Sequence, residues 1–229
     1  MVNMETYDKH LNQTCSHLAL RKAVGWIAIL LPFTLMAGES LLFRGNKILF
    51  SISQYYYSGM RDVFVGALCA IALFLFYYRG HDSWDNWLGN IAGFAALGTA
   101  FFPTPEHGES SWLGVVHFIC ASCFFLTLAG FSLFLFTRKD THPTREKLKR
   151  NKIHVVCGSC MIASMIVIVI YFNFFHAGNP KSGFIFWTET FALVAFGISW
   201  LTKGGTICPD KNIPDASFNS QNPSDIEKP

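Results

Sequence analysis

The sequence predicts an all-α fold, a polytopic transmembrane bundle of six helices with both termini in the cytoplasm. Of the 229 residues, 51% are hydrophobic and 14% are charged, whereas a soluble domain is roughly 25% charged. The apolar residues gather into long runs, and a helix needs about 20 such residues to cross a hydrocarbon layer of roughly 30 Å. Lysine and arginine then concentrate on one side of the bundle that these runs would form.

Six apolar runs are the expected membrane helices. Backbone polar groups in lipid must hydrogen-bond within their own segment, which favours helices. The runs are also too long for barrel strands, and they do not alternate as barrel strands do. In chain order they span residues 23–43, 63–78, 87–103, 111–137, 153–175 and 183–202.

The basic residues set the expected orientation. With six crossings and a cytoplasmic N-terminus, 14 of the 18 Lys and Arg residues fall on the cytoplasmic side, where such residues are enriched. The four on the outer side are Arg44, Lys47, Arg61 and Lys181. We therefore expect a multi-pass protein of a bacterial inner (plasma) membrane, in contact with membrane lipids. Its basic loop at 138–152 faces lipid headgroups and not nucleic acid.

Three regions are expected along the chain. Residues 1–20 are a polar cytoplasmic lead, residues 21–203 form the six-helix membrane domain, and residues 204–229 form a disordered cytoplasmic tail, because their composition cannot bury a core. In the third run, Gly89 and Gly93 have the spacing of small residues that lets helices approach closely. This face is expected to pack within the chain, with a homo-oligomer contact as the alternative. Trp84 and Trp200 are expected near the inner membrane interface.

A polar block at 51–62 separates the first two runs, and it is where a functional site is expected. In the orientation above, this block, which ends at Asp62, lies on the outer side of the membrane. His117 and Glu189 are expected in the same leaflet. Ionisable groups inside a membrane are costly unless they are paired or functional. An outward-facing cavity would use these three as catalytic residues, and the ligand-binding candidates are Ser51, Ser53, Tyr56 and Arg61.

The same residues also fit a purely structural network. In that alternative Arg61 pairs with Asp62 or Glu189, and His117 donates to a carboxylate. Ser51 and Ser53 are weak nucleophile candidates by sequence, because no Gly-x-Ser-x-Gly elbow surrounds them and no histidine is close in the chain. The segment is expected to be interfacial or re-entrant.

The sequence singles out no metal site. If a metal such as zinc is bound, His117 and Asp62 are the expected ligands, since His and carboxylates can hold a divalent ion. No His-x-x-x-His pair supplies two ligands from one helix face. The pairs Cys120-Ala-Ser-Cys123 and Cys157-Gly-Ser-Cys160 lie at different expected depths, which argues against a shared zinc ion.

The stretch from Ser51 to Gly66, SISQYYYSGMRDVFVG, resembles the signature of a family of uncharacterised bacterial multi-pass membrane proteins. Residues 93–103 and 196–204 are similar in the same way, and this family implies no activity. A more distant analogy is to membrane hydrolases of the alkaline ceramidase and adiponectin-receptor type. Those proteins hold zinc with Ser, Asp and three His in seven helices, whereas here six helices are expected and the late His pair is missing.

Three functions remain open from the sequence. The first is a membrane-embedded lipid hydrolase or lipid-binding protein that works from the outer leaflet. The second is a small-solute or proton-coupled transporter. It is disfavoured because the inner halves of the runs carry no comparable polar group, although His154 lies at one inner boundary. The third is a structural or accessory membrane protein.

Overall fold

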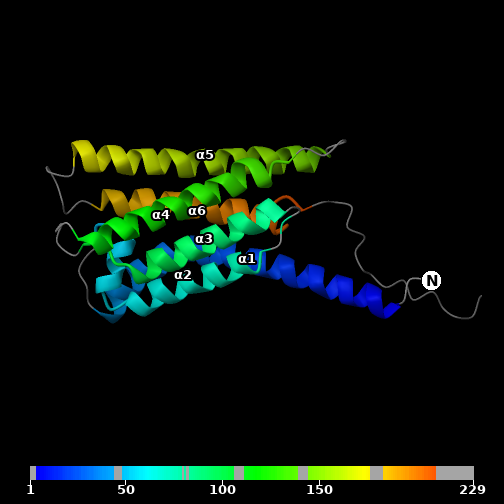
Figure 1. Cartoon of the computed structure of the whole chain (residues 1–229), viewed down its shortest axis with the longest axis horizontal. Coiled ribbons are helices and arrows are strands. Elements are labelled where there is room, and N and C mark those ends of the chain that lie inside the picture. Colours follow the sequence, from blue (N-terminus) through cyan, green and yellow to red (C-terminus); the bar gives the residue numbers. More distant parts are fainter. Residues whose placement is uncertain are drawn as a thin grey trace, which may run out of the picture.

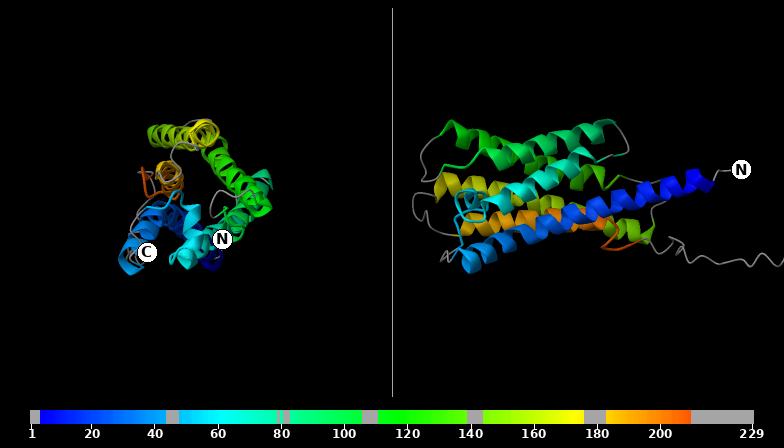
Figure 2. Two further views of the ribbon diagram at one scale, coloured as in Figure 1. Left: turned by 90° about the vertical axis from the view of Figure 1, so that its left-hand side faces the viewer. Right: turned by 90° about the horizontal axis from the view of Figure 1, so that it is seen from below.

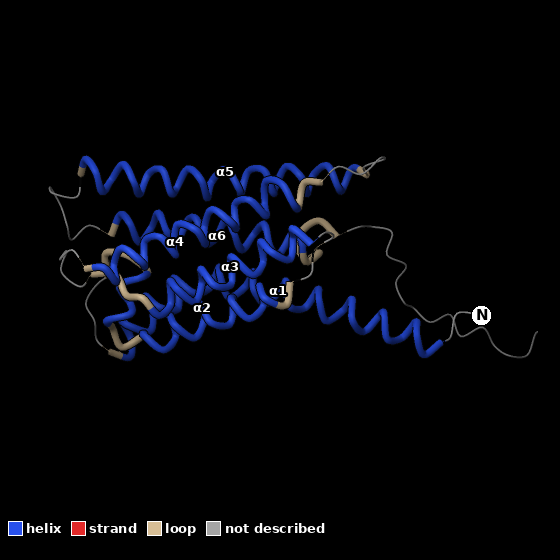
Figure 3. Tube along the Cα trace, viewed as in Figure 1, coloured by secondary structure: helices blue, strands red, loops and turns tan. Residues whose placement is uncertain are grey.

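The computed structural model describes residues 4–43, 48–78, 80, 83–105, 111–138, 144–175 and 183–209, with side chains from Leu18 onward. This part of the chain is all-helical and contains no strand, which confirms the predicted all-α class (Figure 3). A short 3-10 turn, η1, and a π-helical turn, η2, accompany the six helices. The elements are α1 (Met4–Leu42), η1 (Ser53–Tyr57), α2 (Arg61–Phe76), α3 (Ser83–Phe101), α4 (Trp112–Gly130), η2 (Phe131–Leu135), α5 (Arg145–Phe174) and α6 (Phe184–Lys203).

The helices run up and down along one common direction (Figure 1). Each helix packs on the next in chain order, and α6 returns to pack along α1, which closes the circuit (Figure 2). The start of α1 and the end of α6 therefore lie at the same end of the bundle, and η1 lies at the other. The two ends are called the α1-start end and the η1 end below.

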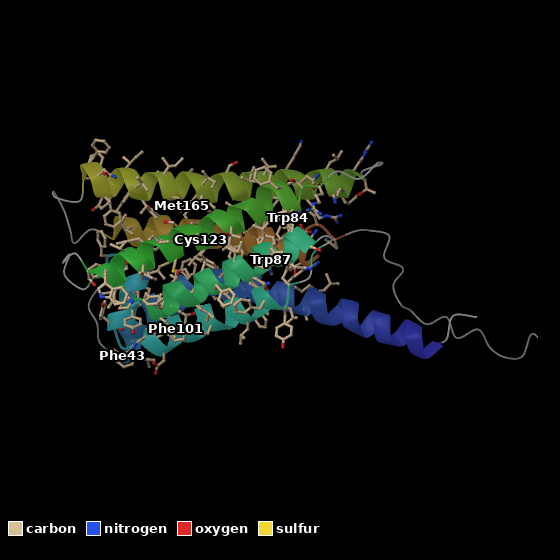
Figure 4. All side chains as sticks on the ribbon, in the orientation of Figure 1. Phe43, Trp84, Trp87, Phe101, Cys123 and Met165 are labelled. Carbon is tan, nitrogen blue, oxygen red and sulfur yellow. The ribbon has the colours of Figure 1, made fainter. Side chains whose placement is uncertain are left out.

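Among the described residues, four helical segments are long and apolar enough to cross a membrane: Leu18–Leu42, Trp112–Leu135, Arg145–Phe174 and Phe184–Lys203. The 16 residues of α2 fall short of the roughly 20 that a straight span needs. Large aromatic side chains remain exposed at both ends of α3, with Trp84 and Trp87 at one end and Phe101 at the other (Figure 4). Such exposure suits a lipid-facing surface with interfacial aromatic residues.

Two helices extend beyond the expected apolar runs. α1 begins at Met4, so most of the predicted polar lead is helical. α5 begins at Arg145, inside the predicted basic loop, where the Thr144 side chain caps the helix by accepting a hydrogen bond from the Lys147 amide at 3.2 Å. Lys, Arg and Glu favour helix, and a cap satisfies an otherwise free amide, so polar sequence there does not stop the helix. The tail at 210–229 and residues Arg44, Lys47 and Lys181 lie outside the described residues.

Trp200 is a core residue and not an interfacial one, which corrects the prediction. Its side chain is 2% exposed. The cause is the position of α6, which packs against both α1 and α5 and so buries much of its own surface. Four aromatic rings surround Trp200 at centroid distances of 5.2–5.7 Å, those of Tyr78, Phe131, Phe136 and Phe196.

Glycines set the closest helix contacts. A Cβ at Gly89 would lie 2.9 Å from the Leu75 carbonyl oxygen, and one at Gly93 would meet the Phe76 ring, so this face packs on α2 of the same chain. Self-association through it would require α2 to be displaced. At the α1–α6 crossing, a Cβ at Gly197 would lie 2.7 Å from the Gly25 carbonyl oxygen. Because the two helix backbones are in direct contact here, no flexible side chain can move aside to make room for an added methyl group.

We expect Gly197→Ala to lower the stability of the bundle by about 1–3 kcal/mol, because the added methyl group must push α1 and α6 apart. The matched control is Gly66→Ala, since nothing lies within 4 Å of a Cβ there. Alanine at an open helical position gains up to about 1 kcal/mol of helix propensity. Thermal unfolding of the purified protein in detergent measures both, and an unchanged melting temperature for Gly197→Ala would contradict the described crossing.

Candidate functional site

The polar block between α1 and α2 folds into the η1 end of the bundle (Figure 1). Its own side chains satisfy its backbone: the Ser51 hydroxyl accepts from the Gln54 amide at 3.2 Å, and the Gln54 side-chain oxygen accepts from the Phe50 amide at 3.1 Å. The Phe186 amide of α6 donates to the Phe50 carbonyl at 2.9 Å. A non-helical segment is tolerated at membrane depth only where protein satisfies its backbone. Ser51, Ser53 and Tyr55 are accordingly buried.

Ser53 and His117 form a hydrogen-bonded pair at the centre of this end. The Ser53 Oγ and His117 Nε2 atoms are 3.0 Å apart, and His117 Nδ1 lies 2.6 Å from the Phe102 carbonyl oxygen. A carbonyl can only accept, so Nδ1 carries the proton. In the neutral ring Nε2 is then the acceptor, and the Ser53 hydroxyl donates to it. Both side chains are buried, at 8% and 2% exposure.

Glu189 reaches the same segment from α6. Its Oε2 accepts a hydrogen bond from the Ile52 amide at 2.6 Å, next in the chain to Ser53. The structure thus brings together His117 and Glu189, which the sequence proposed as catalytic, and Ser53, which it proposed as ligand-binding. The Ser53 cluster is defined below as Ser53, His117 and Glu189 with the Ile52 amide and the Phe102 carbonyl.

Three further polar groups near this end are buried without a hydrogen-bond partner in the described structure: Glu39 Oε2, Tyr55 Oη and Thr104 Oγ1. The Leu49 backbone approaches Tyr55 Oη without reaching hydrogen-bond geometry. Burying a polar group without a hydrogen-bond partner costs free energy.

The other predicted residues lie around the cluster and not in it. Asp62 is exposed in the first turn of α2, where a carboxylate favours the helix N-terminus. Arg61 donates to Tyr56 Oη at 2.6 Å, and its guanidinium carbon lies 4.2 Å from the centre of that ring. In the structural alternative Arg61 would pair with Asp62 or Glu189, whereas its hydrogen-bond partner is Tyr56. His117 would donate to a carboxylate, whereas its partners are the Ser53 hydroxyl and the Phe102 carbonyl. Ser51 serves as a turn cap.

The candidate ligands His117 and Asp62 do not fit a zinc ion. Within the described ranges, no group of three His, Cys, Asp or Glu side chains lies together. Both ring nitrogens of His117 are already engaged, and Asp62 is exposed at the start of α2. The two Cys-x-x-Cys pairs carry free thiols, and the Cys120 sulfur fills the space beside Gly98.

A second polar cluster lies at the α1-start end and includes His154, which the sequence placed at the boundary of an apolar run. Ser132 Oγ and Ser199 Oγ are 2.8 Å apart, and Ser199 Oγ lies 2.9 Å from His154 Nδ1, with all three side chains buried. Asp85 also pairs with Arg138 at 2.7 Å. Sequence offered little signal, because serines scattered through apolar runs pair only after folding.

No known protein family matches this sequence, and no similar protein with a curated description or a solved structure is found. The resemblance of residues 51–66 to a bacterial membrane family therefore stays an expectation. The case for function rests on the Ser53 cluster itself.

Replacing Glu189 tests how the polar segment is anchored. We expect Glu189→Ala to lower stability by about 1–3 kcal/mol, because it leaves the buried Ile52 amide without its acceptor. Glu189→Gln keeps a side-chain oxygen at that position and should retain most of the stability. Thermal unfolding in detergent measures both variants, and an equal loss for alanine and glutamine would show that the Ile52 contact does not anchor the segment.

Proposed function

We propose that this protein is a membrane-embedded hydrolase of lipid esters, with Ser53 as the nucleophile and His117 as the general base. The observation that supports this most is the ordered chain of Ser53 Oγ, His117 Nε2, His117 Nδ1 and the Phe102 carbonyl. A nucleophile within reach of a base, and a base oriented by a third group, is the arrangement that activates a serine hydroxyl.

The chemistry follows from the hydrogen-bond directions. Ser53 Oγ attacks the ester carbonyl carbon while its proton moves to His117 Nε2. The imidazolium is stabilised by the Nδ1–H bond to the Phe102 carbonyl. His117 then protonates the leaving alcohol oxygen as the C–O bond breaks, which leaves an acyl-serine. A water molecule deprotonated by His117 attacks that acyl group and releases the carboxylic acid, and Ser53 regains its proton.

The surroundings favour a lipid as the substrate. An apolar depression on the outer surface of α4 is lined by Val115, Phe118, Ile119, Ser122, Cys123, Leu126 and Thr127. Phe118 is next in the chain to His117 and contacts its ring edge-on. An acyl chain fits against such a surface, while the His117 side chain is buried toward the interior of the bundle.

We further propose the complete topology, with six crossings, both termini in the cytoplasm and the η1 end facing outward. The up-and-down order of the helices and the shared end of the α1 start and the α6 end support it. The distribution of Lys and Arg gives the sidedness. The outer leaflet of a bacterial plasma membrane is then the source of the substrate.

A proton-coupled transporter is the second candidate, and the cluster of Ser132, Ser199 and His154 favours it. Buried polar groups now occur toward both ends of the bundle, and buried ionisable residues often mark proton or solute pathways. Proton-driven uptake into proteoliposomes that is lost in His154→Ala but kept in Ser53→Ala would select this function over the hydrolase.

Labelling with a lipid-like fluorophosphonate tests the hydrolase directly. We expect Ser53 to be modified, and Ser53→Ala to abolish labelling while the protein stays folded. Ser51→Ala is the matched control, because Ser51 is an equally buried serine two residues away whose hydroxyl only caps a turn. His117→Gln should slow labelling on the order of 10²–10⁴-fold, the usual contribution of a general base.

Two outcomes would contradict the hydrolase. One is labelling that survives Ser53→Ala, since the reactive residue would then lie elsewhere. The other is a well-folded wild-type protein that neither reacts with the probe nor releases fatty acid from phospholipid vesicles. Mass spectrometry of the labelled peptide identifies the modified residue.

A further inference from the structure

A small pocket at the α1-start end lies between α1, α2 and α6, at the far end of the bundle from the Ser53 cluster. Arg21 of α1, Tyr78 after α2 and Trp200 of α6 line it together. The Arg21 guanidinium carbon lies 5.5 Å from the centre of the Tyr78 ring, which holds the cation at the pocket. The pocket opens to the surroundings, and its enclosed part has room for about one water-sized group.

Trp200 gives this pocket an unused donor. Its indole Nε1 is buried and has no hydrogen-bond partner among the described residues, although the side chain is only 2% exposed. An indole nitrogen can donate and cannot accept, and a guanidinium likewise carries donors alone. A ligand that satisfies both must present acceptor oxygens.

The charge at this pocket also favours an anion. Arg21 is the charged residue among the side chains that line it. An anion bound beside Arg21 would pair with its charge, and basic pockets between membrane helices commonly hold anionic headgroups.

The remaining walls of the pocket are apolar, formed by Leu20, Val24 and Phe74. Tyr77 also lines it and is 69% exposed, so its ring stands at the surface. A free inorganic anion gains no favourable contact from apolar walls, whereas a phospholipid places its glycerol and acyl carbons against them. A lipid phosphate satisfies the donors and also covers the apolar walls, whereas a free phosphate satisfies only the donors.

We propose that the pocket between α1, α2 and α6 binds the phosphate headgroup of an anionic phospholipid. One phosphate oxygen enters the pocket toward Trp200 Nε1 and Arg21, and the rest of the headgroup stays outside. With the proposed orientation, this lipid belongs to the cytoplasmic leaflet. The site is separate from the Ser53 cluster and does not depend on the hydrolase activity.

Lipid retention measured by native mass spectrometry tests the site. The full-length protein is incubated with equimolar phosphatidylglycerol and phosphatidylcholine in detergent, and the bound lipids are compared. We expect preferential retention of phosphatidylglycerol, reduced on the order of tenfold by Arg21→Gln, because a hydrogen bond to a charged group is lost. Lys22→Gln is the matched control, since it removes the same charge from the next residue, which is exposed and does not line the pocket.

Trp200→Phe is the second variant, because it keeps the aromatic ring and removes only the Nε1 donor. We expect it to reduce retention about fivefold, the effect of one neutral hydrogen bond. Melting temperatures confirm that each variant is folded, and Ser53→Ala should retain the lipid as the wild type does. Three results would overturn the proposal: equal losses for Arg21→Gln and Lys22→Gln, equal retention of both lipids by the wild type, or displacement of the lipid by millimolar inorganic phosphate.

Discussion

The hydrogen bond between the Ile52 amide and the Glu189 carboxylate joins residues 137 positions apart and fixes the polar segment inside the bundle. Within a membrane, the amides and hydroxyls of a non-helical segment must find hydrogen-bond partners in the protein itself. Glu189 of α6 accepts the hydrogen bond of the Ile52 amide, and His117 of α4 accepts that of the Ser53 hydroxyl. That constraint accounts for the position of Ser53, the orientation of His117 and the enclosure of this end of the bundle.

Sequence predicted the all-α class, because long apolar runs with little charge and no alternation favour membrane helices over barrel strands. It also predicted that His117 and Glu189 approach the polar block. The histidine partner of Ser53 is 64 positions away in the chain, so a search for a histidine close in sequence could not find it. Asp62, a catalytic candidate by sequence, is exposed and lies outside the Ser53 cluster. The pairing of Ser132 with Ser199 was not foreseen, because such contacts arise only from helix packing.

The two hydrogen-bonded polar clusters of the described residues lie toward opposite ends of the bundle. Between the clusters lies a packed core that includes Phe124, Leu128, Met161 and Phe196, all at most 2% exposed. Such packing leaves few unpaired groups for water to satisfy. The two proposed sites therefore lie at opposite ends of the bundle: the Ser53 cluster at the η1 end and the Arg21 pocket at the α1-start end.

The tautomer of His117 is the most direct test of the proposed mechanism. Nitrogen-15 NMR of selectively labelled protein in lipid distinguishes a protonated ring nitrogen from one that carries a lone pair. The hydrogen bond to the Phe102 carbonyl requires the proton on Nδ1, so Nε2 should be the unprotonated atom and should change its chemical shift in Ser53→Ala. A protonated Nε2 in the resting protein would contradict the account, because His117 would then donate to Ser53 and could not take its proton.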